Sequence, residues 1–294
     1  MSNTQMSAEL YSSLIEAEKK KNRPKYGRVV PMVIILVLFF APFYYLFVTI
    51  FKTSLEYAQN PVLALPQSIW PLWDNIIEAW VLADMGQTAF NSLTYAVIGG
   101  VVSVAFAAAA AYGLTRTRLR FANAWFMLIF AGTLFPFQMY LVPLFFGYQK
   151  LGIMNSRLGM MLIYTAVCIP FPLLVLRNSI AGISHEIDEA ARIEGASEIR
   201  IFLSMIIPNV KGALIALFLL QFTFIWNDLL FSSILANNQE VRSIMSALQR
   251  LQGIYSTKGP NILMTATLIS SFPTVLLFVF LRKHFMSGMQ ISGH

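Results

Sequence analysis

Long apolar runs separated by shorter polar segments alternate along the whole chain. Each run is about as long as an α-helix that crosses the hydrocarbon layer of a membrane, which needs about 20 residues. Prolines lie within several runs, where they are expected to kink the helices. We therefore predict an all-α membrane protein with six transmembrane helices, at residues 29–51, 89–114, 122–148, 158–180, 208–235 and 261–281.

The composition of the chain supports this interpretation. Hydrophobic residues make up 57% of the chain and charged residues 12%, whereas soluble domains carry about 25% charged residues. The first apolar run begins at Val29, behind a long polar segment. It is longer than the apolar region of a signal peptide, about 7–15 residues, so we expect it to remain as an anchor. Cys168 is the single cysteine, so no disulfide can form within the chain.

The distribution of positive charge predicts the orientation of the chain. Six spans place both termini on one side, and most of the 21 Lys and Arg residues lie on that side. Positive residues concentrate on the cytoplasmic side of a membrane. We thus predict a cytoplasmic N-terminal tail (1–28), a six-span domain (29–284) and a cytoplasmic C-terminal tail (285–294). Between spans two and three we interpret three basic residues as topology determinants and contacts for anionic lipids, namely Arg116, Arg118 and Arg120.

One polar interruption, at residues 182–208, separates the fourth and fifth runs. Its pattern predicts two short helices with a break between them. Ser184 and Ser197 are placed to cap the two N-termini, and Gly195 lies where a left-handed backbone would end the first helix. Between them, the small side chains of Ala190-Ala191 would let another surface approach the backbone closely.

The same segment resembles the EAA loop of the membrane subunits of binding-protein-dependent ABC importers. The family pattern has Glu-Ala-Ala, a glycine and a proline at fixed spacings, which Glu189-Ala190-Ala191, Gly195 and Pro208 match. The resemblance implies a type I ABC importer permease fold with a cytoplasmic coupling helix between spans four and five. The residues implied to couple to an ATPase subunit are Glu186, Glu189, Ala190, Ala191, Gly195 and Pro208. Departures from the pattern occur at Met205, Ile207, Ser184 and Gly212.

The resemblance extends over about residues 85–290. The segments that recur in the carbohydrate-type branch are Asn91-Ser92-Leu93, 111–116, 151–153, Trp226-Asn227-Asp228 and 248–252. The chain is similar to the smaller of the two membrane subunits of maltose-type importers. Its last residues, 288–294, depart from the ending that is common in that branch and that reaches between the ATPase subunits in some relatives.

The resemblance implies a transport subunit of the bacterial cytoplasmic membrane rather than an enzyme. Its implied partners are a homologous second permease subunit, two ATPase subunits, an extracytoplasmic solute-binding protein, membrane lipid and a sugar, oligosaccharide or polyol substrate, with no nucleic acid. The sequence has no G-x-x-x-x-G-K-[ST] phosphate loop. We therefore expect no cofactor in this chain, and expect ATP and Mg²⁺ to be bound by the partner ATPase subunits.

Several polar and aromatic residues in the apolar runs could line a path for substrate. Asp228 lies well inside such a run, and an intramembrane carboxylate usually faces the bundle interior or a wet cavity. It fits equally well as a structural carboxylate bound to a neighbouring helix. The glutamines could instead join helices, and the aromatic side chains could simply pack. The candidates for a translocation path are Trp226, Asn227, Asp228, Gln138, Gln221, Phe135 and Tyr140.

Two other classes of function are weighed against the importer. A self-sufficient secondary transporter or channel could use Asp228, although we find no internal repeat of the kind many such transporters have. An intramembrane enzyme would need a paired nucleophile and base, which the sequence does not show. The three histidines, His185, His284 and His294, have no partners at metal-coordinating spacing. We expect neither a catalytic site nor a metal site.

Overall fold

The computed structural model describes residues 26–117 and 119–290, which form helices and contain no strand. The expected N-terminal tail up to residue 25, Arg118 and the last four residues lie outside this part. In chain order the helices are α2 (Tyr26–Ile50), α3 (Ser54–Gln59), α4 (Pro71–Leu82), α5 (Met85–Arg116), α6 (Ala122–Ala131), α7 (Gln138–Leu151), α8 (Arg157–Cys168), α9 (Pro170–Ala181), α10 (His185–Ile193), α11 (Glu198–Ile201), the π-helix η1 (Phe202–Ile206), α12 (Ile207–Asn209), α13 (Lys211–Trp226), α14 (Leu230–Leu235), α15 (Ile244–Lys258) and α16 (Pro260–Gln290).

The predicted all-α membrane fold is confirmed, but the count of six spans is not. Among the described residues, three helical segments are long and apolar enough to cross a membrane, at Val29–Ile50, Met85–Arg116 and Pro260–Phe280. The number rises to five if each of two bent helix pairs counts as one span. One pair, α8 with α9, bends by 44° just before Pro170, which confirms the predicted kink in span four.

Spans three and five are not the continuous helices that the apolar runs predicted. The third run forms α6 and α7 with a break at residues 132–137, which contains Pro136. The fifth run also breaks: α13 ends at Trp226 and α14 begins at Leu230. Proline removes a backbone donor and fixes its own φ, so the third run need not continue as one helix. The break of the fifth run contains no proline; there the Asp228 side chain accepts hydrogen bonds from backbone N–H groups of the new helix.

The helix α5 lies at the centre of the bundle. It runs without interruption over 32 residues and packs against α8, α9 and α13. The helices approach closely at Gly99, where an added Cβ atom would lie 3.0 Å from Ile225 Cδ1 and 3.1 Å from Tyr164 Cβ. Small side chains therefore set how closely α8 and α13 approach α5.

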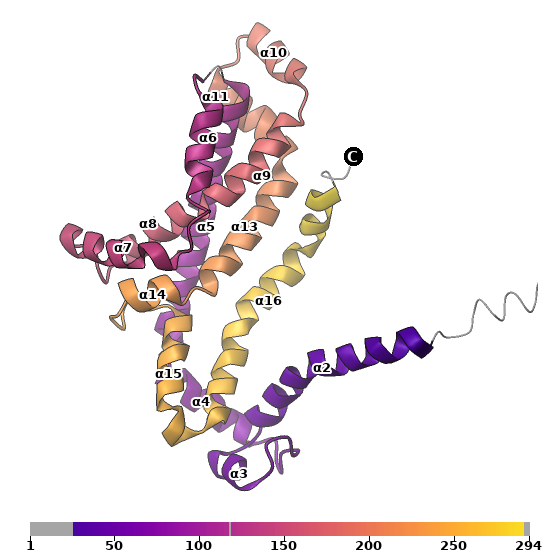
Figure 1. The fold of residues 1–294 in the computed structure, drawn as a ribbon, viewed down its shortest axis with the longest axis vertical. Coiled ribbons are helices and arrows are strands. Elements are labelled where there is room, and N and C mark those ends of the chain that lie inside the picture. Colours follow the sequence, from indigo (N-terminus) through magenta and orange to yellow (C-terminus); the bar gives the residue numbers. More distant parts are fainter. Residues whose placement is uncertain (1–25, 118, 291–294) are drawn as a thin grey trace, which may run out of the picture.

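The two ends of the molecule carry different elements. Figure 1 shows α10 and α11 at one end of the bundle and α3, α4 and α15 at the other, with α5 and α13 running between them. The helix α2 leans away from the other helices, and most of its apolar side chains, from Val29 to Phe47, are exposed. The apolar surface of α2 thus remains available to lipid or to another chain.

Candidate functional site

The polar segment at the end of the bundle folds as two capped helices. The Ser184 hydroxyl accepts a hydrogen bond from the backbone N–H of Glu186 at 3.3 Å, and the Ser197 hydroxyl accepts one from Arg200 at 3.4 Å. Gly195 has φ +81°, a left-handed conformation that is cheap for glycine. The predicted break between two short helices and all three of its local signals are confirmed.

One face of α10 turns toward the bundle and carries a buried ion pair. Asp188 and Ala191 lie three residues apart and are both buried. Asp188 Oδ2 lies 3.1 Å from Nη1 of Arg116, the last residue of α5, and the two side chains are 1% and 0% exposed. Burying two charges is costly, and removal of one partner from such a pair typically costs about 3–5 kcal/mol. The ion pair therefore joins α10 to the end of α5.

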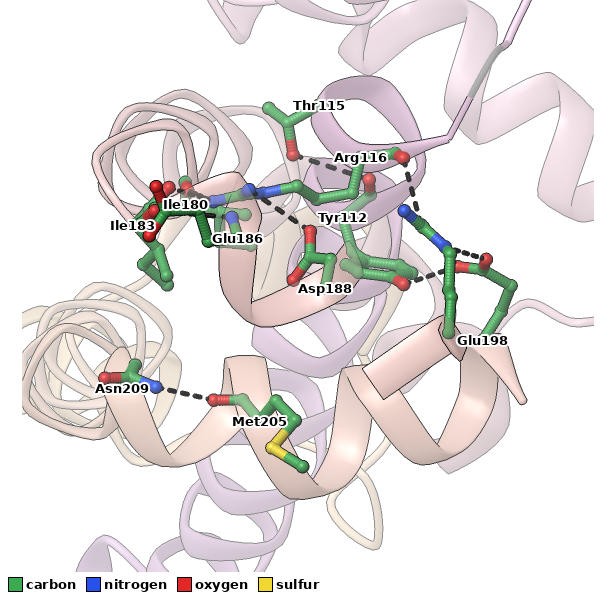
Figure 2. Close-up of polar contacts among 12 residues, drawn as sticks. Tyr112, Thr115, Arg116, Ile180, Ile183, Glu186, Asp188, Glu198, Met205 and Asn209 are labelled. Atoms are coloured by element: carbon green, nitrogen blue, oxygen red, sulfur yellow. Dashed lines mark hydrogen bonds and ion pairs between the residues drawn. The ribbon is translucent and has the colours of Figure 1, made fainter. Parts of the chain in front are cut away.

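Arg116 makes further contacts that the sequence did not reveal. Its Nη2 donates to the carbonyl oxygen of Ile180, in the last turn of α9, at 2.6 Å and to that of Ile183, two residues after this helix, at 2.5 Å (Figure 2). The last carbonyls of a helix lack partners within the helix and attract positive charge. The interpretation of Arg116 as a contact for anionic lipids was therefore wrong, because its side chain is buried and bound inside the protein. Its role as a topology determinant stays a prediction.

A second link joins α5 to α11. Tyr112 Oη donates to Glu198 Oε2 at 2.6 Å, and Arg192 Nε donates to Glu198 Oε1 at 2.8 Å (Figure 2). The hydrogen bond from Arg192, followed by that from Tyr112, lowers the pKa of the Glu198 carboxyl below its usual range. Because the pair of Arg192 and Glu198 is partly exposed, we expect it to contribute less stability than the buried pair.

The opposite face of α10 and α11 is exposed and mixes acids with apolar side chains. Glu186, Glu189, Ala190 and Gly195 are all exposed there, whereas Ala191 is buried against the bundle. Of the two alanines, only Ala190 is thus exposed where a partner surface could approach its backbone. Ala191 is covered by the bundle. Exposed large apolar side chains are Ile187 and Ile193 on α10, Ile199 on α11 and Leu203 on η1, and Ile193 is 88% exposed.

Pro208 lies at a sharp corner after these helices. The segment Glu198–Asn209 includes a π-helical turn, and it meets α13 at an angle of 79°. Asn209 Nδ2 donates to the carbonyl oxygen of Met205 at 2.7 Å (Figure 2). Such π-helical turns mark places where the backbone hydrogen-bond ladder is rearranged. Pro208 is exposed and ends the surface segment, whereas the span itself begins at Lys211.

A cavity brings together three of the residues predicted to line a path. It has a volume of about 740 Å³ and lies between α7, α8, α9 and α13, with Phe135, Tyr140 and Gln221 in its wall. Gln221 is buried and supplies an amide to a largely aromatic and aliphatic wall. Gln138, at the start of α7, is exposed and does not line this cavity.

The other three path candidates lie at the end of α13. Trp226 is buried and its Nε1 donates to the carbonyl oxygen of Ser270 at 3.0 Å. Asn227 is exposed and its Nδ2 donates to the carbonyl oxygen of Thr223 at 2.9 Å. Neither side chain reaches the cavity that contains Gln221.

Asp228 serves as a cap within the protein. Its Oδ1 and Oδ2 accept hydrogen bonds from the backbone N–H groups of Phe231 at 3.4 Å and Ser232 at 3.2 Å, at the start of α14. The buried hydroxyl of Tyr164 on α8 also donates to Oδ2, at 2.8 Å. The geometry thus corresponds to the structural alternative, a carboxylate bound to neighbouring elements rather than one that faces a wet cavity.

The fold and the exposed loop together define a class of protein, an integral membrane protein whose helical bundle ends in a protruding pair of short helices. The chain belongs to the family described as binding-protein-dependent transport system inner membrane components, which matches residues 100–291. The matched region begins inside α5 and contains the ion pair of Arg116 with Asp188 and the whole surface loop.

Similar proteins of known name include two from Bacillus subtilis (strain 168). The probable ABC transporter permease protein YurM is 27% identical over 281 residues, which are 94% of this chain and 91% of that protein. The melibiose/raffinose/stachyose import permease protein MelC is 27% identical over 270 residues, 91% of this chain and 96% of that protein. A crystal structure of a bacterial ABC transporter involved in the import of the acidic polysaccharide alginate is similar in fold, with a TM-score of 0.75 and 22% identity over 90% of this chain and 99% of that one.

Proposed function

We propose that this chain is one permease subunit of an ATP-driven, type I importer for a sugar, oligosaccharide or polyol. The family supports the importer, since its description names an inner membrane component of binding-protein-dependent transport. The carbohydrate class is supported by MelC, whose name specifies import of melibiose, raffinose and stachyose. The single observation that carries the proposal is the exposed face of α10 and α11, which protrudes from the bundle.

That exposed face has the chemistry of a protein docking surface. The apolar side chains of Ile193 and Ile199 are exposed on the same loop as the exposed acids Glu186 and Glu189. Exposed apolar groups rimmed by charge are typical of protein contacts. An ATPase subunit with an apolar groove and a basic residue at its edge would cover Ile193 and pair with Glu189. Gly195 ends the helix without a side chain, so it leaves room for the partner.

The rest of the assembly follows from this role. A homologous second permease subunit would complete the bundle, and two ATPase subunits would bind ATP and Mg²⁺. A solute-binding protein would deliver the substrate at the end that carries α3, α4 and α15. The end that carries α10 and α11 would then be cytoplasmic, together with both termini, in agreement with the distribution of positive charge.

The cavity beside Gln221 is the best candidate for a stretch of the translocation path. Its wall combines aromatic rings of Phe135 and Tyr140 with the Gln221 amide. Rings can stack on the apolar faces of a sugar, while an amide can both donate to and accept from a hydroxyl group. The cavity would face the second permease subunit, which would form the remaining wall.

The composition of the native complex tests the proposal. We expect a tag on this chain to purify, in mild detergent, a second permease and two copies of an ATPase. ATP hydrolysis by this complex should rise when its solute-binding protein is added with sugar. A single chain that transports substrate in liposomes without ATP would contradict the proposal and favour a self-sufficient transporter.

The docking role of Glu189 is tested separately by reversing its charge. In Glu189→Lys we expect the chain to insert at the normal level but to lose the ATPase subunit during purification, with uptake reduced at least tenfold. Glu189→Gln keeps the size and removes the charge, so it should be affected less. Normal uptake in Glu189→Lys would exclude Glu189 from the docking surface.

A further inference from the structure

Both ends of α5 are tied to surface segments through buried polar side chains. At the end that carries α10, the Arg116 guanidinium pairs with Asp188 and donates to two carbonyl oxygens at the end of α9. One turn earlier, Tyr112 donates to Glu198 on α11. The last turns of α5 therefore hold both helices of the exposed loop, as Figure 2 shows.

The opposite end of α5 holds the segment before α15 in a similar way. Asn91 Nδ2 donates to the carbonyl oxygens of Glu240 and Arg242 at 2.8 and 3.1 Å. Tyr95 Oη donates to the carbonyl oxygen of Val241 at 2.8 Å. Ser92 Oγ accepts a hydrogen bond from the backbone N–H of Ile244 at 2.8 Å, and Asn91, Ser92 and Tyr95 are all buried. These bonds fix residues 240–244 to α5.

The helix between these two joints is suited to carrying displacement. It contains 32 residues and no proline, and at 1.5 Å per residue it is about 48 Å long. It is packed along its length against α8, α9 and α13. A continuous helix with charged or hydrogen-bonded joints at both ends moves the two attached segments together, whereas the broken spans could absorb displacement at their bends.

We propose that α5 is a rigid strut that couples the exposed loop at one end to residues 240–244 at the other, with Arg116 as the positioning residue that joins the strut to the loop. This inference rests on the proposed function, because it assigns the path by which movement of the docking surface reaches the opposite face. Arginine suits the joint since its planar fork of donors serves an acid and two carbonyls at once, which the compact ammonium of lysine does not reproduce.

We call the contact of Arg116 with Asp188 the inner joint. It is tested by the amount of substrate taken up per ATP hydrolysed in proteoliposomes that contain the whole complex. Asp188→Asn keeps the shape of the side chain and removes its charge. We expect it to reduce uptake per ATP at least tenfold while the ATPase subunits remain bound. Asp188→Glu keeps the charge and should retain at least a third of the wild-type ratio. An equal loss in both variants, or a normal ratio in Asp188→Asn, would overturn the proposal.

We call the hydrogen bonds of Asn91, Ser92 and Tyr95 to residues 240–244 the outer joint. A variant at this joint tests whether the two joints act one after the other through α5. Tyr95→Phe removes only the hydrogen bond to Val241, and we expect it to reduce uptake per ATP at least threefold. If the two joints act in series through α5, the double variant Asp188→Asn with Tyr95→Phe should have the same uptake per ATP, within about twofold, as the single variant with the lower uptake per ATP. Losses that multiply would show two unrelated defects and would overturn the strut.

A variant that fails to accumulate in the membrane does not end the test. If Asp188→Asn is absent from membranes, uptake per ATP is measured for Arg116→Lys instead. This variant keeps the positive charge but lacks the planar guanidinium group. We expect a normal membrane level and at least a threefold lower ratio, and a wild-type ratio would overturn the proposal. The proposed function fails separately, when the wild-type complex contains no ATPase or transports without ATP.

Discussion

At the scale of single residues, Asp228 shows how a buried carboxylate can be committed to structure. It receives two backbone N–H groups of α14 and the hydroxyl of Tyr164, so its oxygens are held by donors from two elements. An acid occupied in this way is poorly placed to exchange protons with a substrate path. The alternative of a secondary transporter that uses Asp228 accordingly finds no support in its surroundings.

Substitution of Asp228 separates the two roles. Asp228→Ala removes the cap, worth about 1 kcal/mol, and leaves the Tyr164 hydroxyl without its acceptor, at about 1–3 kcal/mol. We expect a lower unfolding temperature for the purified chain. Asp228→Asn retains acceptor capacity and should keep uptake within about threefold of the wild type. Loss of uptake in Asp228→Asn at an unchanged unfolding temperature would instead indicate a direct role in transport.

The residue scale also shows which details the sequence can predict. Ser184, Gly195 and Ser197 act on backbone groups within a few residues of themselves, so their roles as caps and helix stop follow from local order. Arg116 pairs with Asp188, 72 positions further along the chain, and a basic residue that follows an apolar run looks the same whether it meets lipid or an acid. The one available signal was the spacing of Asp188 and Ala191, which places both on one face of α10.

At the scale of elements, the exposed loop of α10 and α11 depends on the backbone conformation of Gly195. Its φ of +81° costs an ordinary residue about 1–2 kcal/mol, and among the described residues no atom lies within 4 Å of an added Cβ. We expect Gly195→Val to insert normally and to lose at least 90% of uptake, because the end of α10 is displaced. Gly195→Asn should retain most uptake, since asparagine tolerates the left-handed region.

An equal defect in Gly195→Asn and Gly195→Val would contradict the conformational argument and would point to steric exclusion by the partner. Both variants should be compared at matched levels of the chain in the membrane.

The packing of α5 yields a prediction with a control on the same helix. A Cβ at Gly99 would crowd Ile225 and Tyr164, whereas within the described structure a Cβ at Gly113 meets no atom within 4 Å. Overpacking of this kind costs about 1–3 kcal/mol. We expect Gly99→Leu to lower the unfolding temperature of the purified chain by several degrees and Gly113→Leu to change it little. Equal effects of the two changes would show that helix propensity, rather than packing against α8 and α13, sets the stability.

The element scale marks the limit of prediction from apolar runs. Runs two and six form continuous helices, α5 and α16; both begin within a few residues of the predicted bounds, but α16 continues to Gln290, nine residues beyond the predicted end. Run three contains Pro136 within residues 132–137, and there the chain breaks into α6 and α7. Hydrophobicity reports that a segment is buried in lipid or protein, but it does not report whether the backbone turns there. Tertiary packing around the proline decides that.

At the scale of the whole molecule, apolar side chains are exposed in separate regions of the described chain. The helix α2 exposes most of its apolar side chains, and the wall of the cavity beside Gln221 is mostly apolar. The protruding loop exposes Ile193 and Ile199 beyond the bundle. In the proposed importer, lipid, a second membrane subunit and an ATPase subunit would each cover one of these exposed apolar surfaces.

The orientation of the molecule in the membrane is the last prediction, and the single cysteine makes it accessible. Cys168 is buried, so a membrane-impermeant maleimide should not label the wild-type chain in intact cells. Thr117 directly follows the last residue of α5, and Asn238 is next to Gln239, whose Nε2 donates to Asp84 directly before α5. Both positions are exposed, so Thr117→Cys and Asn238→Cys mark the two ends of α5. We expect intact cells to label Asn238→Cys alone and permeabilised cells to label both. Labelling of Thr117→Cys in intact cells would place the docking loop outside, away from ATP, and would exclude its coupling to a cytoplasmic ATPase.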